Sequence, residues 1–307
     1  MIPERLNQFT TWHDIPGQGR IQLVDVFGDE RMIDRAARTT AGAETDEERT
    51  DEKRRGLMRY LMRHRHTTPL EFCEVVFLLE IPMDTWRQMV RHRTASINEY
   101  STRYSPALDE MATVPPGQWR AQAASNRQGS AGLLTGTTEH GGTVEDVQDV
   151  LCQQEQWLHD SARVVYRSRL ERGVAREQAR KDLPLSTMTR AYWKIDLHNL
   201  LHFLGLRLDS HAQLEIRQYA QFMAEVVEAW VPNVWKAFVD YRLEAHTFSR
   251  QEMVALRVMV DRWAQEQVPD ESYVVPHALQ ELEEAGSISK REGVAFLRAV
   301  GLLPDPS

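Results

Sequence analysis

An apolar run bounded by prolines constrains the fold of this chain more than any other feature. Residues 71–82, EFCEVVFLLEIP, are rich in β-branched and aromatic side chains, with Pro69 before the run and Pro82 at its end. The run is too short to cross a membrane, which takes about 20 residues. Because proline cannot donate a ladder hydrogen bond, it marks the ends of central strands. We therefore predict a buried strand here.

Strand and helix patterns mix along the rest of the chain. Further strands are predicted over 21–28 and 186–195. Helical spacing predicts helices over 29–40, 46–63, 83–93, 143–172, 174–181, 197–206 and 210–241, and long loops are predicted over 105–142, which are rich in Pro, Gly, Ser and Thr. Because no βαβ repeat is present, the pattern favours an α+β fold over a doubly wound sheet.

Two of these helices carry specific side-chain predictions. Leu57, Tyr60 and Leu61 should form the buried face of 46–63. Thr143 and Asp146 predict a capping box at the start of the next long helix, and Gly173 predicts its end. The apolar stripe expected to bury that helix consists of Val147, Leu151, Leu158, Ala162 and Val165.

Residues 246–307 differ in character and predict a small helical appendix to a domain of residues 1–245. Two capping-box pairs mark helix starts in this tail, Ser249 with Glu252 and Ser289 with Glu292.

Composition excludes several classes of protein. The net charge is -8, whereas a nucleic-acid-binding surface is normally basic, so an anion site must come from a local arginine cluster. Cys73 and Cys152 lie in no CxxC motif, which argues against a zinc ribbon or a redox dithiol. The first residues have no apolar h-region and no run is long enough to span a membrane, so a cytoplasmic protein is expected.

The first candidate site is an arginine-rich stretch over 87–103. Its chemistry-bearing residues are Arg87, Gln88, Arg91, His92, Arg93, Ser96, Asn98, Glu99, Ser101 and Arg103. Arg87 and Arg91 would share a helix face, and arginines bind phosphate as bidentate donors. The mixture with Ser, Gln, Asn and Glu suits a single nucleotide. The alternative is a solvated basic face with surface ion pairs.

The second candidate site lies over 196–219. His198 and His202 are four residues apart and form a weak metal half-site, since the Glu of HExxH is missing. Arg207 stands in an otherwise apolar helix and needs an anionic partner. That partner is either an internal carboxylate, Asp209 or Glu215, or a substrate phosphate or anionic base ring.

A third short motif, HRHTTPLE at 64–71, follows a predicted helix. His66 could act as a general base or proton shuttle, or as a helix-ending residue. The chain has no GxxxxGK[ST] loop, and GQG at 17–19 lacks the rest of a dinucleotide fingerprint. A nucleotide cofactor would therefore be held without a Rossmann loop.

Five segments in this order resemble one family, the flavin-dependent thymidylate synthases. They are HRHTTPLEF, WRQMVRHRTASINEYSTRYS, NRQGS, GVAREQARKDLP and LRLDSHAQLEIRQYA, and the resemblance spans roughly residues 21–245. The resemblance implies a twisted antiparallel sheet flanked by helices, with long C-terminal helices. It also implies a homotetramer with shared active sites that makes dTMP from dUMP. The carbon donor would be methylenetetrahydrofolate, and FAD reduced by NADPH would supply the hydride.

The resemblance also assigns residues, and no metal. Flavin contacts would be Thr40, His66, Thr68, Glu71, Arg91, His92, Arg93, Thr94, Asp196, His198 and His202. Contacts to dUMP would be Gln88, Arg91, Glu99, Tyr100, Ser101, Thr102, Arg103, Arg180 and Arg207. Catalytic roles would fall to Arg207, Ser101 and His66. Arg180 and Arg207 are expected to come from another subunit. Asp196 and His198 depart from the Asn and Arg of many relatives, and an anionic Asp196 is unfavourable there unless it is paired.

Two other functions remain open on the residues alone. A metal-dependent nucleotide hydrolase would use His198, His202, His211 and Asp209. An RNA-binding module would be centred on Arg87–Arg103, although the acidic net charge argues against it.

Overall fold

The chain forms two units, Met1–Glu244 and Ala245–Ser307. The computed structural model describes residues 2–40, 42, 49–123, 129–140, 143–267 and 290–300. Residues 41 and 43–48, part of the NRQGS segment and Ser289 of the second capping pair lie outside these ranges.

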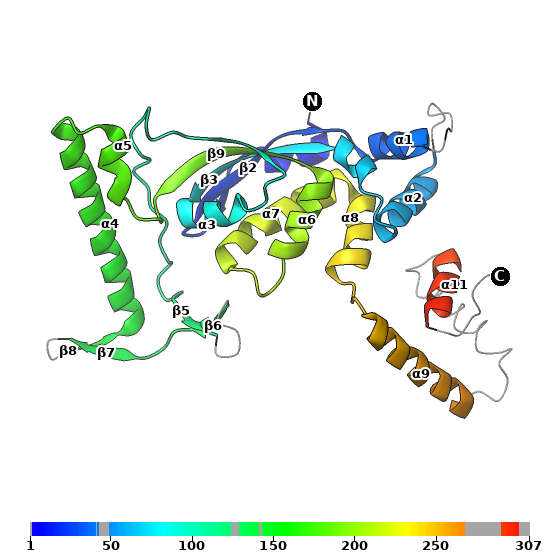
Figure 1. The fold of residues 1–307 in the computed structure, drawn as a ribbon. Coiled ribbons are helices and arrows are strands. Elements are labelled where there is room, and N and C mark those ends of the chain that lie inside the picture. Colours follow the sequence, from blue (N-terminus) through cyan, green and yellow to red (C-terminus); the bar gives the residue numbers. More distant parts are fainter. Residues whose placement is uncertain are drawn as a thin grey trace. The chain divides into compact units, whose positions relative to one another are not determined.

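The first unit is built on a five-stranded antiparallel sheet (Figure 1). The strand order is β1 (His13–Ile15), β2 (Gly19–Phe27), β3 (Glu74–Pro82), β9 (Met188–Asp196) and β4 (Ser96–Glu99). The predicted strand over 71–82 begins at Glu74, because Thr68–Phe72, which contains Pro69, forms a 3-10 turn, η2. The predicted α+β class, with an antiparallel sheet flanked by helices, is confirmed.

Helices α6 (Leu197–Arg207) and α7 (Leu214–Trp230) lie along one face of this sheet (Figure 1). With α8 (Pro232–Phe238) they bury Phe203, Tyr219 and Trp230 in the same core as Phe77 and Trp193 of the sheet. The single helix predicted over 210–241 is wrong. Val231 leaves helical geometry and Pro232, which lacks an amide N–H, starts a new helix that ends in a π-helical turn, η4 (Val239–Leu243).

Four further helices belong to the first unit, namely η1 (Glu4–Phe9), α1 (Glu30–Thr40), α2 (Asp51–Arg63) and α3 (Met83–Met89). The helix predicted over 46–63 begins at Asp51, because the Thr50 hydroxyl caps the amide of Lys53. Its buried residues are Met58, Leu61 and Met62. Tyr60, predicted to be inward, is 42% exposed.

The segment between β4 and β9 contains more structure than predicted. Residues 105–142 carry β5 (Arg120–Gln122), β6 (Ser130–Leu133) and β7 (Thr137–His140), where only loops were expected. Residues Thr143–Asp146 form strand β8 with β7, so α4 runs from Val147 to Glu171, followed by α5 (Arg176–Ala179) and η3 (Arg180–Asp182). Asp146 is the N-cap and accepts a 2.7 Å hydrogen bond from the Gln148 amide.

None of the five residues in the predicted apolar stripe of α4 is buried by the described part of the chain. Only His159 and Tyr166 of α4 are buried, whereas Leu158 and Val165 are 49% and 44% exposed. Helix α4 is amphipathic in sequence, but the described part of unit 1 does not cover its apolar stripe. Gly173, with φ 76°, follows the helix end as predicted.

The second unit contains α9 (Arg250–Gln267) and α11 (Lys290–Ala299). The capping box predicted at its start is present, since Ser249 Oγ accepts from the Glu252 amide at 3.2 Å and Glu252 Oε2 accepts from the Ser249 amide at 2.7 Å. In the described part of the chain, no helix is long and apolar enough to cross a membrane.

A buried carboxylate joins three neighbouring strands. Glu80 on β3 is 4% exposed, and its carboxylate accepts from Arg20 Nε on β2 at 2.5 Å and from Arg190 Nε on β9 at 2.7 Å. Burial acts to raise the pKa of Glu80, but the hydrogen bonds from the two arginines outweigh it and hold the pKa below its ordinary value. A paired buried carboxylate is stabilising, but losing either partner is costly.

We expect Glu80→Gln to lower the free energy of unfolding by about 1–3 kcal/mol at pH 7. Because the folded pKa of Glu80 lies below its unfolded value, this contribution is present above that value and is lost as pH falls through the folded pKa. Denaturant titrations at neutral and acidic pH would measure it. Glu74→Gln is the control, since its ion pair with Lys194 is exposed and should contribute less than about 1 kcal/mol. Equal losses in the two variants would contradict this account.

Candidate active site

The edge strand β4 sets the starting point of a loop that carries several predicted contacts. Its register on β9 runs from Ser96 opposite Lys194 to Glu99 opposite Ala191. The Tyr100 amide then donates to the Arg190 carbonyl at 2.7 Å. Loop 100–105 therefore leaves the sheet from β4, beside Arg190 of β9, whose side chain is held by Glu80.

Glu99 is held by two buried residues that the sequence did not single out. Trp86 Nε1 donates to one carboxylate oxygen at 3.0 Å, and Thr189 Oγ1 donates to the other at 2.8 Å. Trp86 comes from α3 and Thr189 from β9, so no local sequence signal joins them. Both partners orient the carboxylate and leave it open to solvent on its remaining side.

The loop itself folds as a turn around Ser101. The Ser101 carbonyl accepts from the amides of Tyr104 and Ser105 at 3.1 and 3.2 Å, and its hydroxyl accepts from the Arg103 amide at 3.4 Å. No base is hydrogen-bonded to this hydroxyl within the described residues. Ser101 is therefore placed to bind a ligand and not to act as an activated nucleophile.

Two arginines flank this turn. Arg180 donates to the Thr102 hydroxyl, and Arg103 forms an exposed 3.5 Å ion pair with Glu177. Arg180 therefore meets the loop within one chain, and its arrival from another subunit stays a prediction. Residues 176–182 fold back against the loop, which the sequence order alone did not reveal.

Arg207 lies at the end of α6 and contacts a histidine. Its Nε donates to His92 Nε2 at 3.2 Å within the same chain, and its expected role at the site of a second subunit stays a prediction. The carboxylates that could have paired with it are engaged elsewhere, Asp209 with His211 and Glu215 with Arg120. In the described ranges Arg207 has no ion pair. Burial lowers its pKa from the ordinary value.

His92 accepts this hydrogen bond as a neutral ring. Burial, followed by the charges of Arg207 and His202, lowers its pKa to about 4. Its ring packs edge-on against Phe203 with centroids 4.8 Å apart. Because a neutral imidazole compensates no charge, Arg207 keeps its full positive charge for an incoming anion.

The segment between α3 and β4 differs from its prediction. Helix α3 ends at Met89, so Arg91 lies in a turn and does not share a helix face with Arg87. Arg91, Arg93 and Thr94 are exposed, and the two arginines form no ion pair with any described residue. Gln88 donates its amide to Gln213, which precedes α7.

Further predicted contacts gather at the end of β3 and β9, where Glu74 pairs with Asp196. Asp196 is the N-cap of α6 and accepts from the Asn199 amide at 2.9 Å and from its side chain at 2.6 Å. These hydrogen bonds stabilise the Asp196 carboxylate as a helix N-cap without neutralising its charge. Helix α6 carries His198 and His202 and packs against η2.

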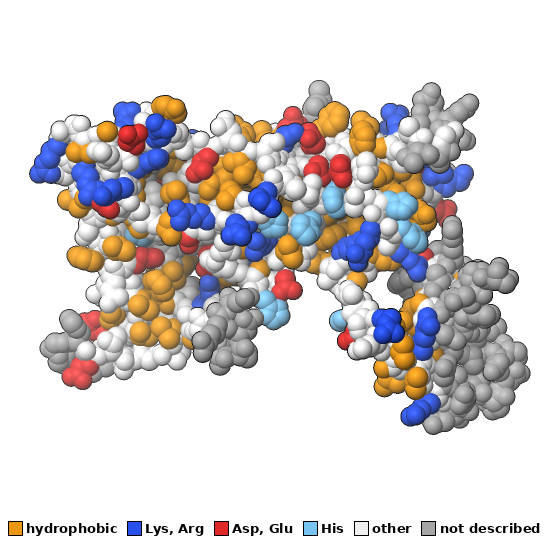
Figure 2. All heavy atoms as spheres, viewed as in Figure 1, with side chains coloured by type: hydrophobic (Ala, Val, Ile, Leu, Met, Phe, Trp, Pro, Cys, Tyr) orange, Lys and Arg blue, Asp and Glu red, His pale blue; other side chains and the backbone are white. Residues whose placement is uncertain are grey.

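Of the remaining predicted residues, Thr68 and Glu71 are exposed on η2. His66 follows α2, with its ring centroid 5.5 Å from that of Tyr60. Thr40 is the last residue of α1, and its side chain lies outside the described set. Basic side chains and histidines gather across the middle of the face in Figure 2.

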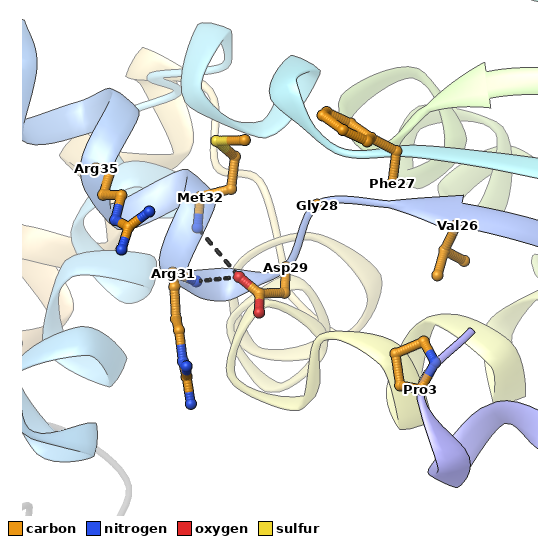
Figure 3. Close-up of a pocket in the computed structure, with 8 residues that line it drawn as sticks. All are labelled: Pro3, Val26, Phe27, Gly28, Asp29, Arg31, Met32 and Arg35. Carbon is orange, nitrogen blue, oxygen red and sulfur yellow. Dashed lines mark hydrogen bonds between the residues drawn. The ribbon is translucent and has the colours of Figure 1, made fainter. Parts of the chain in front are cut away.

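A pocket elsewhere in unit 1 contains none of the predicted residues (Figure 3). It is lined by Pro3, Val26, Phe27, Gly28, Asp29, Arg31, Met32 and Arg35. Asp29 caps α1 there by accepting from the Arg31 and Met32 amides at 2.8 and 3.2 Å. Many of the predicted residues instead lie on the 100–105 loop and on α6, the segments that follow β4 and β9.

The metal-site alternative finds no support in the arrangement of its residues. His211 bonds Asp209 in an exposed turn after α6, away from the helical positions of His198 and His202. Among the described residues, no group of three or more His, Cys, Asp or Glu side chains is placed to hold a metal ion.

Comparison with known proteins places these features in a family. The profile described as "Thymidylate synthase complementing protein", Thy1, matches residues 22–233. A flavin-dependent thymidylate synthase of Gluconobacter oxydans is 43% identical over 277 residues, covering 87% of this chain and 84% of the relative. One from Thermus thermophilus is 46% identical over 240 residues, covering 78% and 83%.

A solved structure supports the same assignment. The UMP/dUMP methylase PolB from Streptomyces cacaoi, bound with 5-Br dUMP, has a TM-score of 0.66 and 29% identity, covering 75% of this chain and 99% of that one.

The Arg207 contact leads to a prediction for the ligand-free protein. We expect Arg207→Ala to raise the pKa of His92 from about 4, because a neighbouring cation is removed, but not to 6.5, because burial is the larger cause. NMR titration of histidine-labelled protein would measure this. Arg87→Ala on the exposed face of α3 is the control. An unchanged pKa of His92 in the Arg207 variant would show that the two side chains do not interact.

Proposed function

Since the chain belongs to the Thy1 family of flavin-dependent thymidylate synthases and is an enzyme that methylates dUMP, we propose that its active site is formed by the residues gathered around β9. One observation carries the proposal. Arg207 is a half-buried cation whose only described side-chain partner is the neutral ring of His92. Such a cation is poised for an anionic ligand.

In this proposal the 100–105 loop binds the nucleotide phosphate. Ser101 and Arg103 donate to phosphate oxygens, and Arg103 exchanges its exposed pairing with Glu177 for the phosphate. Arg180 holds the loop through Thr102 and adds positive charge. The remaining nucleotide contacts are Gln88, Arg91, Glu99 and Tyr100. The oriented carboxylate of Glu99 accepts from sugar or base groups.

Arg207 stabilises negative charge that develops on the uracil ring. A fixed cation acts most strongly in a partly desolvated position, where water does not screen it. His92 orients the guanidinium by accepting from Nε and leaves the terminal nitrogens for the substrate. Phe203 in turn restricts the His92 ring.

The proposed FAD site is the Glu74–Asp196 end of the sheet. Bound FAD, reduced by NADPH, would supply the hydride, and methylenetetrahydrofolate the carbon. The residues present fit the cofactor, because Arg91 and Arg93 have no ion pair with a described residue and the Asp196 charge is engaged by Asn199. The other contacts proposed are Thr40, His66, Thr68, Glu71, His92, Thr94, His198 and His202. His66, exposed after α2, holds or transfers a proton there.

The cysteines of this chain do not support nucleophilic chemistry. Cys73 is fully buried, and burial raises its pKa to about 12, so the thiol stays protonated at neutral pH. Cys152 lies on α4, and both are free thiols, which suits the reducing cytoplasm we propose for this enzyme.

Four exposed apolar side chains on α4 support the proposed homotetramer. Trp157, Leu158, Val164 and Val165 are large apolar side chains that unit 1 leaves exposed. A contiguous apolar helix face of this kind is typical of a subunit interface. Size-exclusion chromatography of the purified protein with light scattering would measure its mass and so test the proposed tetramer.

We expect Arg207→Ala to reduce kcat/KM for dUMP roughly 100- to 1000-fold, the range found when an electrostatic contact to a reacting group is removed. Steady-state NADPH oxidation coupled to dTMP formation would measure it. Arg217→Ala removes a surface arginine from the same region and should have little effect. Near-normal kinetics of the Arg207 variant would refute its role.

We also expect the double variant Cys73→Ser and Cys152→Ser to form dTMP with kcat within a few-fold of the wild type. Neither thiol lies among the proposed contacts. Cys73→Ala with Cys152→Ser controls for loss of stability at the buried position. A well-folded double variant without activity would contradict the cysteine-independent chemistry.

A further inference from the structure

The residue after helix α2 has an unusual backbone. Arg65 has φ 59°, and among the described residues it is the one non-glycine residue with a positive φ. This left-handed conformation strains L-residues other than Asn and Asp, and helices usually end there in Gly or Asn. Strained positions of this kind cluster at functional sites. The side chain of Arg65 therefore needs an explanation.

Helix capping explains the conformation but not the guanidinium. The Arg65 amide donates to the Met62 carbonyl at 3.4 Å and the His66 amide to the Leu61 carbonyl at 2.9 Å, which closes the helix. Glycine or asparagine would make the same backbone hydrogen bonds. A cation at this position interacts favourably with the helix dipole, but Arg63 already supplies a positive charge in the last turn.

A second arginine reaches the same point from η4. Arg242 Nη2 donates at 3.2 Å to Met62 O, the carbonyl that also accepts from the Arg65 amide. Burial first, and then the charge of Arg65, lower the pKa of Arg242. Neither guanidinium pairs with a carboxylate among the described residues, and neighbouring Asp240 is engaged by Arg59. The charge of Arg65 acts against that of Arg242, as the lowered pKa of Arg242 indicates, and a bound anion would relieve this repulsion.

Aromatic rings adjoin this arginine pair. The Tyr60 ring centroid is 4.5 Å from that of His64 and 5.5 Å from that of His66, and all three residues are exposed. This surface thus combines two arginines, Arg65 and Arg242, with three planar rings. In the function proposed above, His66 contacts the flavin, so a molecule bound to these rings would extend to the cofactor.

We propose that Arg65 and Arg242 bind the anionic end of a co-substrate that reacts at the flavin. This inference rests on the proposed function. The ligand chemistry is a phosphate or carboxylate carried by a molecule with a planar ring. NADPH, through its 2′-phosphate, and methylenetetrahydrofolate, through its glutamate carboxylates, both have it.

The test compares Arg65→Gly, Arg65→Asn and Arg65→Lys in the full-length enzyme with bound FAD. Gly and Asn accept the left-handed conformation but remove the charge, whereas Lys keeps the charge. We expect Gly and Asn to raise the KM for one co-substrate roughly 10- to 100-fold, the effect of one charged hydrogen bond. Their Tm should be no lower than that of the wild type. Lys should stay within a few-fold of the wild-type KM.

The choice of co-substrates identifies the ligand. A higher KM for NADPH with an unchanged KM for NADH indicates the 2′-phosphate, and a higher KM for methylenetetrahydrofolate alone indicates the carboxylates. Arg242→Gln should raise the same KM. Arg55→Ala, an exposed arginine on α2, is the charge-matched control and should raise neither.

Two results would overturn the anion site while leaving the enzyme assignment intact. One is unchanged KM values for both co-substrates in active Gly and Asn variants. The other is a Lys variant whose KM rises as much as that of the Gly and Asn variants. The KM for dUMP and the flavin spectrum should stay at wild-type values in all three. A wild-type protein with no dUMP-dependent turnover would overturn the proposed function as well.

Discussion

The antiparallel pairing of β9 with β3 on one side and β4 on the other fixes the starting points of α6 and of the 100–105 loop, which carry many of the proposed contacts. Glu74 opposite Asp196 starts α6 at a defined position, and Ala191 opposite Glu99 sets the point where the 100–105 loop leaves the sheet. A shift of one residue would turn each of these side chains to the other face. Glu80, bonded to arginines on both adjacent strands, opposes such a shift.

The elements predicted best are those whose signals are local. Pro82 marked the end of the buried strand, although its start is Glu74 and not the residue after Pro69, and the Ser249–Glu252 pair marked a helix start that the structure contains. The elements predicted wrongly depend on contacts distant in sequence. Residues 143–146 were predicted as a helix start but pair with β7, and the apolar stripe of α4 is not buried by the described residues.

The candidate site was predictable in its residue types but not in its assembly. Arg207 stood out in sequence as a cation in an apolar helix. That its partner is His92, and not Asp209 or Glu215, follows from the packing of α6 and could not be read from spacing. The supports of Glu99 were missed for the same reason, since Trp86 and Thr189 lie on different elements.

The arginines of this acidic chain fall into two groups. Arg20, Arg190 and Arg120 are paired with carboxylates and hold the fold together. Arg207 and Arg242 are half-buried, with no carboxylate partner among the described residues, and both lie near proposed ligand contacts. Burying a cation without a counter-charge costs stability, and in our proposals the ligands of the enzyme supply that counter-charge.

We propose that the nucleotide and the flavin occupy adjoining parts of one site around β9. The most direct test is a titration of the FAD-loaded protein with dUMP, followed by the visible flavin spectrum. We predict a saturable spectral change, because dUMP bound at Arg207 lies beside His92 and the flavin. Binding of dUMP shown by calorimetry with no change in the flavin spectrum, or a protein that takes up no FAD, would contradict the account.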